Sequence, residues 1–245
     1  MVKNVIKEAL KYIVGLGEAK TQTINCDVYS DKQLYRIDTY IPKAEPIKMH
    51  TLSSLVDYIK SKVDELSEKM IIQVVSPEEV RLFSMLDCNR ERETIAIVQA
   101  QIPSFEYGRF IDHETFCINV QSKFVDDETS DKLLLLKFAG TVENGSIAEY
   151  GDDGVTQKAT VRQGIASKTE AVVPNPVNLI PFRTFVEVRQ PASEFIFRMR
   201  EGARGGIECA IFEADGGAWK LDAMASIRLY LEEQLKDVEG FIIVS

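Results

Sequence analysis

The sequence predicts an α+β fold, with largely antiparallel sheets and flanking helices, in a single domain of residues 1–245. Stretches with helical spacing and stretches with strand-like alternation follow one another without the regular strand–helix–strand order of a parallel sheet. Hydrophobic residues make up 45% of the chain and charged residues 27%, which is ordinary for a globular protein with a sizeable core. A subdomain boundary is best placed near 103–111, in the loop that follows the last of three consecutive strands.

The expected helices are marked by apolar residues at helical spacing and by capping residues at their ends. The first stretch, "VKNVIKEALKYIVGLG", carries a broad apolar face and ends at Gly15 and Gly17. A second helix begins after an N-cap within Thr51–Ser54. Further helices are expected near 112–124, 129–141 and 218–236.

The expected strands are short runs of apolar and β-branched residues. They are Met70–Val75, Val80–Leu86, Thr94–Gln101, four or five strands between 155 and 213, and the final "GFIIVS". A hairpin is expected in "TINCDVYSDKQLYRID", with its polar turn at Ser30–Lys32.

The last strand carries four apolar residues in a row, which is typical of a strand that is buried on both faces. Together with the apolar face of the first helix, it predicts that both chain ends need cover. We therefore expect a homo-oligomer, for which a large closed assembly is one form, with Phe241, Ile242, Ile243 and Val244 as candidate contacts.

Charge and cysteine usage disfavour several classes of function. The net charge of −9 opposes sequence-independent binding to duplex DNA. The four cysteines form no C-x-x-C pair, and Cys26, Cys117 and Cys209 fall in apolar patterns that predict buried, reduced thiols. No secretory signal and no apolar run long enough to span a bilayer is found, so a cytoplasmic location without membrane contact is expected.

The cluster Asp112-His113-Glu114 has the residue types of a reactive site but the spacing of a helix start. Consecutive side chains on a helix point in different directions and do not converge on one ion. Asp112 stands where an N-cap belongs, Glu114 suits the first turn, and Cys117 lies one turn beyond His113. We interpret the cluster as the start of a capped amphipathic helix.

Two acidic, glycine-containing stretches are also interpreted as structural. "GDDGVTQ" (Gly151–Gln157) lacks the ligand spacing of a calcium loop, so Asp152 and Asp153 are assigned to a turn. "FEADGGAWKLDA" lacks both common phosphate-binding patterns, so Asp215 is assigned to a helix N-cap region and Trp219 to the end of the core. No catalytic, cofactor-binding or metal-binding residue is predicted.

An arginine-rich stretch, "PFRTFVEVRQPASEFIFRMREGAR", stands out in this acidic chain. Strand geometry places Phe195, Phe197 and Met199 on one face and the arginines of that strand on the other, while Phe185 shares a face with Arg183 and Arg189. A salt-bridged sheet face or a subunit contact is favoured over a nucleic-acid surface. The candidate nucleic-acid or partner contacts are Arg183, Phe185, Arg189, Arg198 and Arg200.

Four phrases of the sequence resemble one known family. "FIDHETFCINVQSKF", "YGDDGVTQKATVRQGIAS", "VPNPVNLIPFRTFVEVRQPASEFIFR" and "IFEADGGAWKLDA" are similar to the YfdQ-like proteins of phages and prophages, a family of uncharacterised function. The resemblance covers roughly residues 70–232, and the first 65 residues carry no matching motif. It implies a phage or prophage origin and a bacterial cytoplasm, and it carries over no catalytic residue.

These observations together predict a non-enzymatic phage-encoded protein that acts by self-assembly or by binding a partner. The alternative is a nucleic-acid-associated accessory protein of phage replication or recombination that uses the arginines named above. An enzyme with an acidic site, built on Asp112, His113 and Glu114 or on Asp152 and Asp153, is the third reading.

Overall fold

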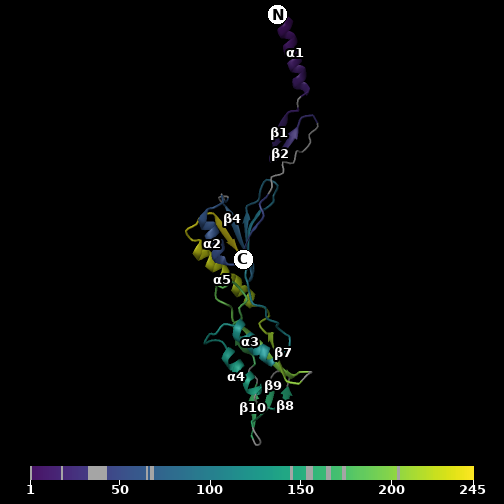
Figure 1. The fold of residues 1–245 in the computed structure, drawn as a ribbon. Coiled ribbons are helices and arrows are strands. Elements are labelled where there is room, and N and C mark those ends of the chain that lie inside the picture. Colours follow the sequence, from purple (N-terminus) through teal and green to yellow (C-terminus); the bar gives the residue numbers. More distant parts are fainter. Residues whose placement is uncertain are drawn as a thin grey trace.

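A computed structural model describes residues 2–17, 19–32, 43–64, 66, 69–143, 146–152, 157–163, 167–172, 175–202 and 205–245. It confirms the α+β class, with helices and mostly antiparallel sheets. Figure 1 shows an elongated arrangement, with helix α1 (Val2–Gly17) at one end and the small sheet of β8, β9 and β10 at the other. Among the helices within these ranges, none has the length and apolar character needed to cross a membrane.

The first core is built on a five-stranded sheet with the order β14-β4-β5-β6-β3. Its strands are β3 (Ile47–Met49), β4 (Met70–Ser76), β5 (Glu79–Ser84), β6 (Thr94–Gln99) and β14 (Phe241–Val244). The β14–β4 and β3–β6 pairs are parallel and the other pairs are antiparallel. Helices α2 (Leu52–Ser61) and α5 (Trp219–Gln234) contribute their apolar residues to this core (Figure 1).

The second core is built on a four-stranded sheet with the order β11-β12-β13-β7. Its strands are β7 (Ile111–Asp112), β11 (Val177–Leu179), β12 (Ser193–Glu201) and β13 (Ile207–Glu213), and helices α3 (His113–Lys123) and α4 (Lys132–Glu143) join it. The face assignment on β12 is confirmed, because Phe195, Phe197 and Met199 are buried while Ile196 and Arg200 are exposed.

Two smaller sheets complete the described chain. One is the hairpin of β1 (Thr21–Ile24) and β2 (Asp27–Ser30), and the other contains β8 (Ser146–Asp152), β9 (Gln157–Gln163) and β10 (Ser167–Val172). β8 and β9 pair with Asp152 opposite Gln157, while residues 153–156, including Asp153, lie outside the described residues. Only the flanks of the turn expected at Gly151–Gln157 are therefore described.

The first hairpin turns earlier than the sequence predicts. β1 and β2 pair across a turn at Asn25 and Cys26, inside the expected first strand, and the residues 33–42 that would pair across the expected turn at Ser30–Lys32 lie outside the described residues. Asn25 has a φ of 60°, a left-handed conformation that asparagine tolerates better than most residues. A two-residue turn with Asn at its start competes well with a longer polar segment, which explains the shift.

Both predicted helix starts are confirmed. Thr51 Oγ1 accepts the Ser54 N–H at 3.2 Å, and the Asp112 carboxylate accepts the Thr115 N–H at 2.9 Å. Hydrogen bonds from the side chain and backbone of Thr115 lower the pKa of Asp112. The Asp112-His113-Glu114 cluster is thus a capped helix start, and His113 Nε2 lies 3.5 Å from Cys117 Sγ one turn later.

Strand β14 differs from the expectation of burial on both faces. It forms an edge of its sheet, with Phe241 and Ile243 packed against the first core. Ile242 and Val244 point to the other face and are 48% and 41% exposed. The expectation was wrong within a single chain because α2 and α5 cover only one face of this sheet. A contact with a second copy through β14 stays a prediction.

The cysteine prediction was correct for Cys209, which is buried, and wrong for Cys26, which is exposed. Cys26 occupies the hairpin turn, so its apolar neighbours in sequence do not enclose it. A hydrogen bond with Cys88, which is also exposed, raises the pKa of the Cys26 thiol. Cys117 has intermediate exposure.

Candidate binding site between the two cores

The segment 181–191 connects the second core to the first. Phe185 and Val188 belong to the first core, although the strand that follows belongs to the second. The Gln190 side chain shapes the segment, since its Oε1 accepts the N–H groups of Arg183 at 2.9 Å and Thr184 at 3.2 Å. The Thr184 hydroxyl donates to the carbonyl of Pro77 in the β4–β5 turn. The two cores are therefore joined by buried contacts of defined geometry.

Arg183 is the central charged group at this junction and is only 4% exposed. Its guanidinium pairs with Glu213 at 3.2 Å and donates to the Pro191 carbonyl at 3.3 Å and to the Ser193 hydroxyl. It also lies over the ring of Trp219, 3.9 Å from the centroid. Burial lowers the pKa of Arg183, yet an arginine keeps its charge because its ordinary pKa is far above neutrality.

A pocket of about 640 Å³ opens beside this arginine. Aromatic and charged side chains line it together with apolar and small residues from the β4–β5 turn and the loop after β6. Burial raises the pKa of Tyr107 to about 12, so its hydroxyl stays protonated at neutral pH. The aromatic and charged lining residues are Phe105, Tyr107, Phe182, Trp219, Glu78, Arg183, Glu213 and Lys220.

Two N–H donors in the wall of this pocket are buried without an acceptor among the described residues. They are Nε of Arg183 and Nε1 of Trp219. Such a donor costs ~1–3 kcal/mol relative to a satisfied one, so proteins seldom leave two together. A ligand that brings hydrogen-bond acceptors would remove this penalty.

The start of α5 lies next to the pocket, but its backbone donors are already engaged. The loop before it uses positive φ angles at Gly216 (64°) and Gly217 (84°), which glycine adopts without strain. The Asp215 carboxylate accepts the Gly217 N–H at 2.9 Å and the Ser193 hydroxyl at 2.6 Å. Asp215 therefore holds the turn before α5, whose N-cap is Ala218 without a side-chain cap bond, and these contacts argue against a phosphate held by the helix end.

The groups around Asp215 explain why its carboxyl group is ionised. Burial raises the pKa of this carboxyl, but hydrogen bonds from Ser193, Gly217 and Trp219 and the charge of Arg183 outweigh it. The pKa of Asp215 is therefore lowered, and the carboxylate stays ionised at neutral pH. It balances Arg183 from one side while Glu213 balances it from the other.

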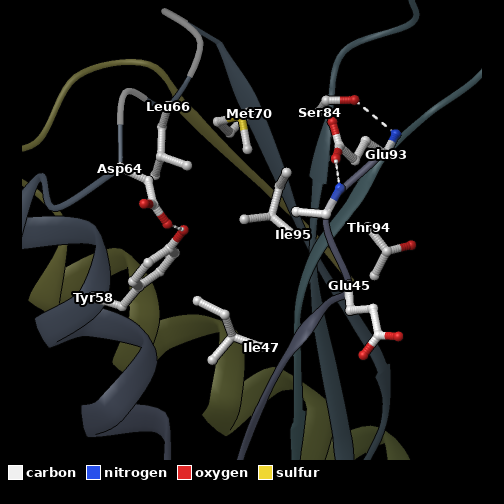
Figure 2. Close-up of a pocket in the computed structure, with 11 residues that line it drawn as sticks. Glu45, Ile47, Tyr58, Asp64, Leu66, Met70, Ser84, Glu93, Thr94 and Ile95 are labelled. Atoms are coloured by element: carbon white, nitrogen blue, oxygen red, sulfur yellow. Dashed lines mark hydrogen bonds between the residues drawn. The ribbon is translucent and has the colours of Figure 1, made fainter. Parts of the chain in front are cut away.

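A second pocket, of about 340 Å³, lies between α2 and the sheet of the first core (Figure 2). Several of its polar groups are hydrogen-bonded: Tyr58 donates to Asp64 at 2.7 Å, and Glu93 accepts the Ala44 N–H at 3.2 Å. Burial and the bond to Asp64 raise the pKa of Tyr58 to about 12. Figure 2 shows Ile47 and Ile95 between these polar groups, so the pocket is an extension of the core with a partly paired polar rim.

The five predicted nucleic-acid or partner contacts do not form one surface. Arg183 and Phe185 are buried, whereas Arg189 and Arg200 are exposed and Arg198 is half-buried. The expectation that Phe185 shares a face with Arg183 and Arg189 was wrong, because this segment is a loop and not a strand.

Arg200, on the outer face of β12, is engaged by neighbouring residues. It pairs with Glu208 at 2.7 Å and lies 4.2 Å from the centroid of the Phe110 ring. This agrees with the expectation of a salt-bridged sheet face at that position.

Within the described part of the chain, no group of three or more histidine, cysteine, aspartate or glutamate residues is arranged to hold a metal ion. The sequence did not predict the pocket at the junction because its residues come from distant segments. The single tryptophan beside a glycine pair was the strongest signal for it, and it was assigned to the core alone.

Comparisons with protein-family models, with curated proteins and with solved structures found no match to this chain. The resemblance to the YfdQ-like family therefore stays a prediction.

Proposed function

We propose that this chain is a non-enzymatic, phage- or prophage-encoded protein that assembles with copies of itself in the bacterial cytoplasm. The observation that carries the proposal is helix α1. Its large apolar side chains from Val5 onward are between 54% and 70% exposed, and they belong to neither of the two cores. These side chains are Val5, Ile6, Leu10, Tyr12, Ile13, Val14 and Leu16.

The apolar side chains of α1 gather on one side of the helix. At about 100° per residue they form a stripe roughly 200° wide, with Ile6 and Ile13 near its middle. Glu8 and Lys11 lie on the opposite side, and Lys7 lies just outside the stripe beside Val14. Monomeric proteins seldom leave such a continuous apolar stripe in water, so the stripe favours packing against another copy.

A second surface is available at the other chain end. Ile242 and Val244 of β14 share the uncovered face of the first sheet with Val75, and the outer edge of β14 has no neighbouring strand among the described residues. Open strand edges pair readily, and contacts between two different surfaces close into rings when the rotation allows it.

The test is the native mass of wild-type protein, measured by light scattering after size exclusion. We expect a multiple of 27.6 kDa. The double variant Ile6→Asn/Ile13→Asn removes the middle of the apolar stripe and should lower the mass. Glu8→Asn/Lys11→Asn introduces the same residues on the opposite side and should leave the mass unchanged.

A concentration-independent mass of one chain for the wild type would overturn the proposal. An equal loss of mass in both double variants would show that helix formation, not the apolar stripe, controls assembly. If the wild type is a single chain that binds anionic vesicles, and the Ile6/Ile13 variant does not, α1 is a lipid-surface helix instead.

The alternative role, in nucleic-acid binding, is supported by fewer residues than self-assembly. Arg198 and Arg200 lie on the outer side of β12 with Ile196, on a surface that single strands could reach. Because the chain is acidic overall, we expect little binding at physiological ionic strength.

Submicromolar binding of a thymidine oligomer that weakens steeply with salt would favour this alternative. It should then be lost in Arg198→Glu/Arg200→Glu and kept in Arg109→Glu/Arg228→Glu, which changes two exposed arginines elsewhere. Equal loss in both variants would point to net charge alone.

A further inference from the structure

We propose that the pocket between the two cores binds a planar aromatic ligand that carries one anionic group. This site is separate from the assembly surfaces of α1 and β14. The proposal therefore stands or falls independently of self-assembly.

The size and walls of the pocket favour a flat ring. Its volume of about 640 Å³ falls within the range of small-molecule sites, which are often found where two structural units meet. The Phe105 and Tyr107 rings lie 4.8 Å apart, and Tyr107 stacks on Phe195 at 5.7 Å. Phe182 is 37% exposed, so this part of the aromatic wall remains open to solvent. Aromatic walls of this kind stack well on planar ligands.

The unsatisfied donors require acceptors on the ligand. Arg183 already uses Nη1 for Glu213 and Nη2 for Pro191 and Ser193, which leaves only Nε without an acceptor among the described residues. Nε1 of Trp219 is in the same condition. Both atoms are shielded from solvent, so an acceptor reaches them only when a side chain of the wall moves.

The balance of charge favours a single anionic group. The Arg183 charge is matched by Glu213 and Asp215, whereas the exposed Lys220 ammonium makes no ion pair with a described residue and lies 5.9 Å from the centroid of the Trp219 ring. Lys220 is therefore the cation open to a ligand. Glu78 also lines the pocket and would oppose a second anionic group.

The experiment uses the full chain and its own reporter. Trp219 is the only tryptophan, so its fluorescence reports on this pocket alone. Two probes carry a ring and an anionic group: phenylacetate represents aromatic carboxylates, and adenosine monophosphate represents nucleotides. Phenylethanol and adenosine lack the anionic group, while acetate and inorganic phosphate lack the ring.

We expect a saturable change in Trp219 emission with at least one anionic aromatic probe, and binding at least about tenfold tighter than that of its neutral or ringless counterpart. The probe that binds identifies the source of the ligand as carboxylate or nucleotide. Calorimetry with the same probe confirms the affinity without the fluorophore.

A matched pair of variants on α5 tests the charge. Lys220→Gln should weaken the binding of the anionic probe at least about tenfold and leave the binding of the neutral probe unchanged, because only the ion pair is lost. Lys236→Gln, which changes an exposed lysine paired with Glu233 beyond the far end of the helix, should leave both unchanged.

No saturable signal and no heat with either anionic aromatic probe would overturn the proposal. Equal affinity for the ringless anion would overturn its aromatic part, and equal weakening in both lysine variants would show that the binding is unspecific. Circular dichroism and the Trp219 emission of the free variants verify that each is folded.

Discussion

Helices α1 and α5 have the same length of 16 residues but opposite surroundings. α1 carries the cleaner apolar stripe and exposes it, whereas α5 exposes Leu221 and Leu229 and still buries Ile227 and Leu231 in the first core. An apolar stripe predicts that a helix needs cover, but the position of a partner decides whether it receives cover within its own chain. α5 follows β13 and packs its buried side on the sheet of the first core, while nothing in the described structure packs on the stripe of α1.

The largest expected difference between the two helices concerns stability. Ile227→Ala should lower the free energy of unfolding by ~2–5 kcal/mol, because it opens a cavity in a closed core. Ile13→Ala should change it by less than ~0.5 kcal/mol at concentrations where the chain is a single copy, since that side chain is mostly in water. Urea unfolding followed by circular dichroism measures both.

The same pair of variants distinguishes burial within a chain from burial between chains. If α1 is an intersubunit contact, the effect of Ile13→Ala on the unfolding midpoint grows with protein concentration, while that of Ile227→Ala does not. A large effect of Ile13→Ala in dilute protein would contradict the exposed position of α1.

A smaller effect is expected in the turn before α5, where the Asp215 carboxylate accepts the Gly217 N–H and the Ser193 hydroxyl. Because the pKa of Asp215 is lowered by folding, its charge contributes stability above its unfolded pKa, and this contribution is lost as the pH falls below about 4. Asp215→Ala should lower the free energy of unfolding by about 1 kcal/mol at neutral pH.

Asp215→Asn separates the hydrogen bonds from the charge. Asparagine keeps an acceptor for the helix start, so we expect most stability to remain at neutral pH but with less loss on acidification than in the wild type. Thermal unfolding between pH 3 and pH 7 (roughly the range in which carboxyl groups titrate) measures both variants. An unchanged acid response in Asp215→Asn would show that other carboxyl groups dominate it.

The last prediction leaves stability unchanged and compares thiols in the two regions. Cys26 lies in the hairpin next to α1 and is exposed, so a thiol reagent reaches it, although the hydrogen bond with Cys88 raises its pKa and slows the reaction. Burial raises the pKa of Cys209 to about 12, which keeps this thiol protonated and covered. Mass spectrometry after brief labelling of native protein should find label on Cys26 and Cys88 and none on Cys209. Early labelling of Cys209 would mean that the second core opens more easily than its packing suggests.

Local patterns predicted the elements that depend on neighbouring residues. The caps at Thr51 and Asp112 and the alternation on β12 follow from interactions within a few residues, so the sequence contains all that is needed. The errors at the first hairpin and at Cys26 arose where two local signals competed and a polar segment was preferred over a shorter turn. The assignment of Phe185 failed because alternation was read as a strand where a loop crosses between cores.

The sequence by itself determined the α+β class, the main helices and strands and the apolar stripe of α1. Only the tertiary structure placed Arg183 over Trp219 and brought both to one pocket with Tyr107. Only it showed that β14 is an edge strand with one open face. The reason is physical: periodicity and capping act along the chain, whereas a pocket and a free edge depend on which distant segments fill the remaining space.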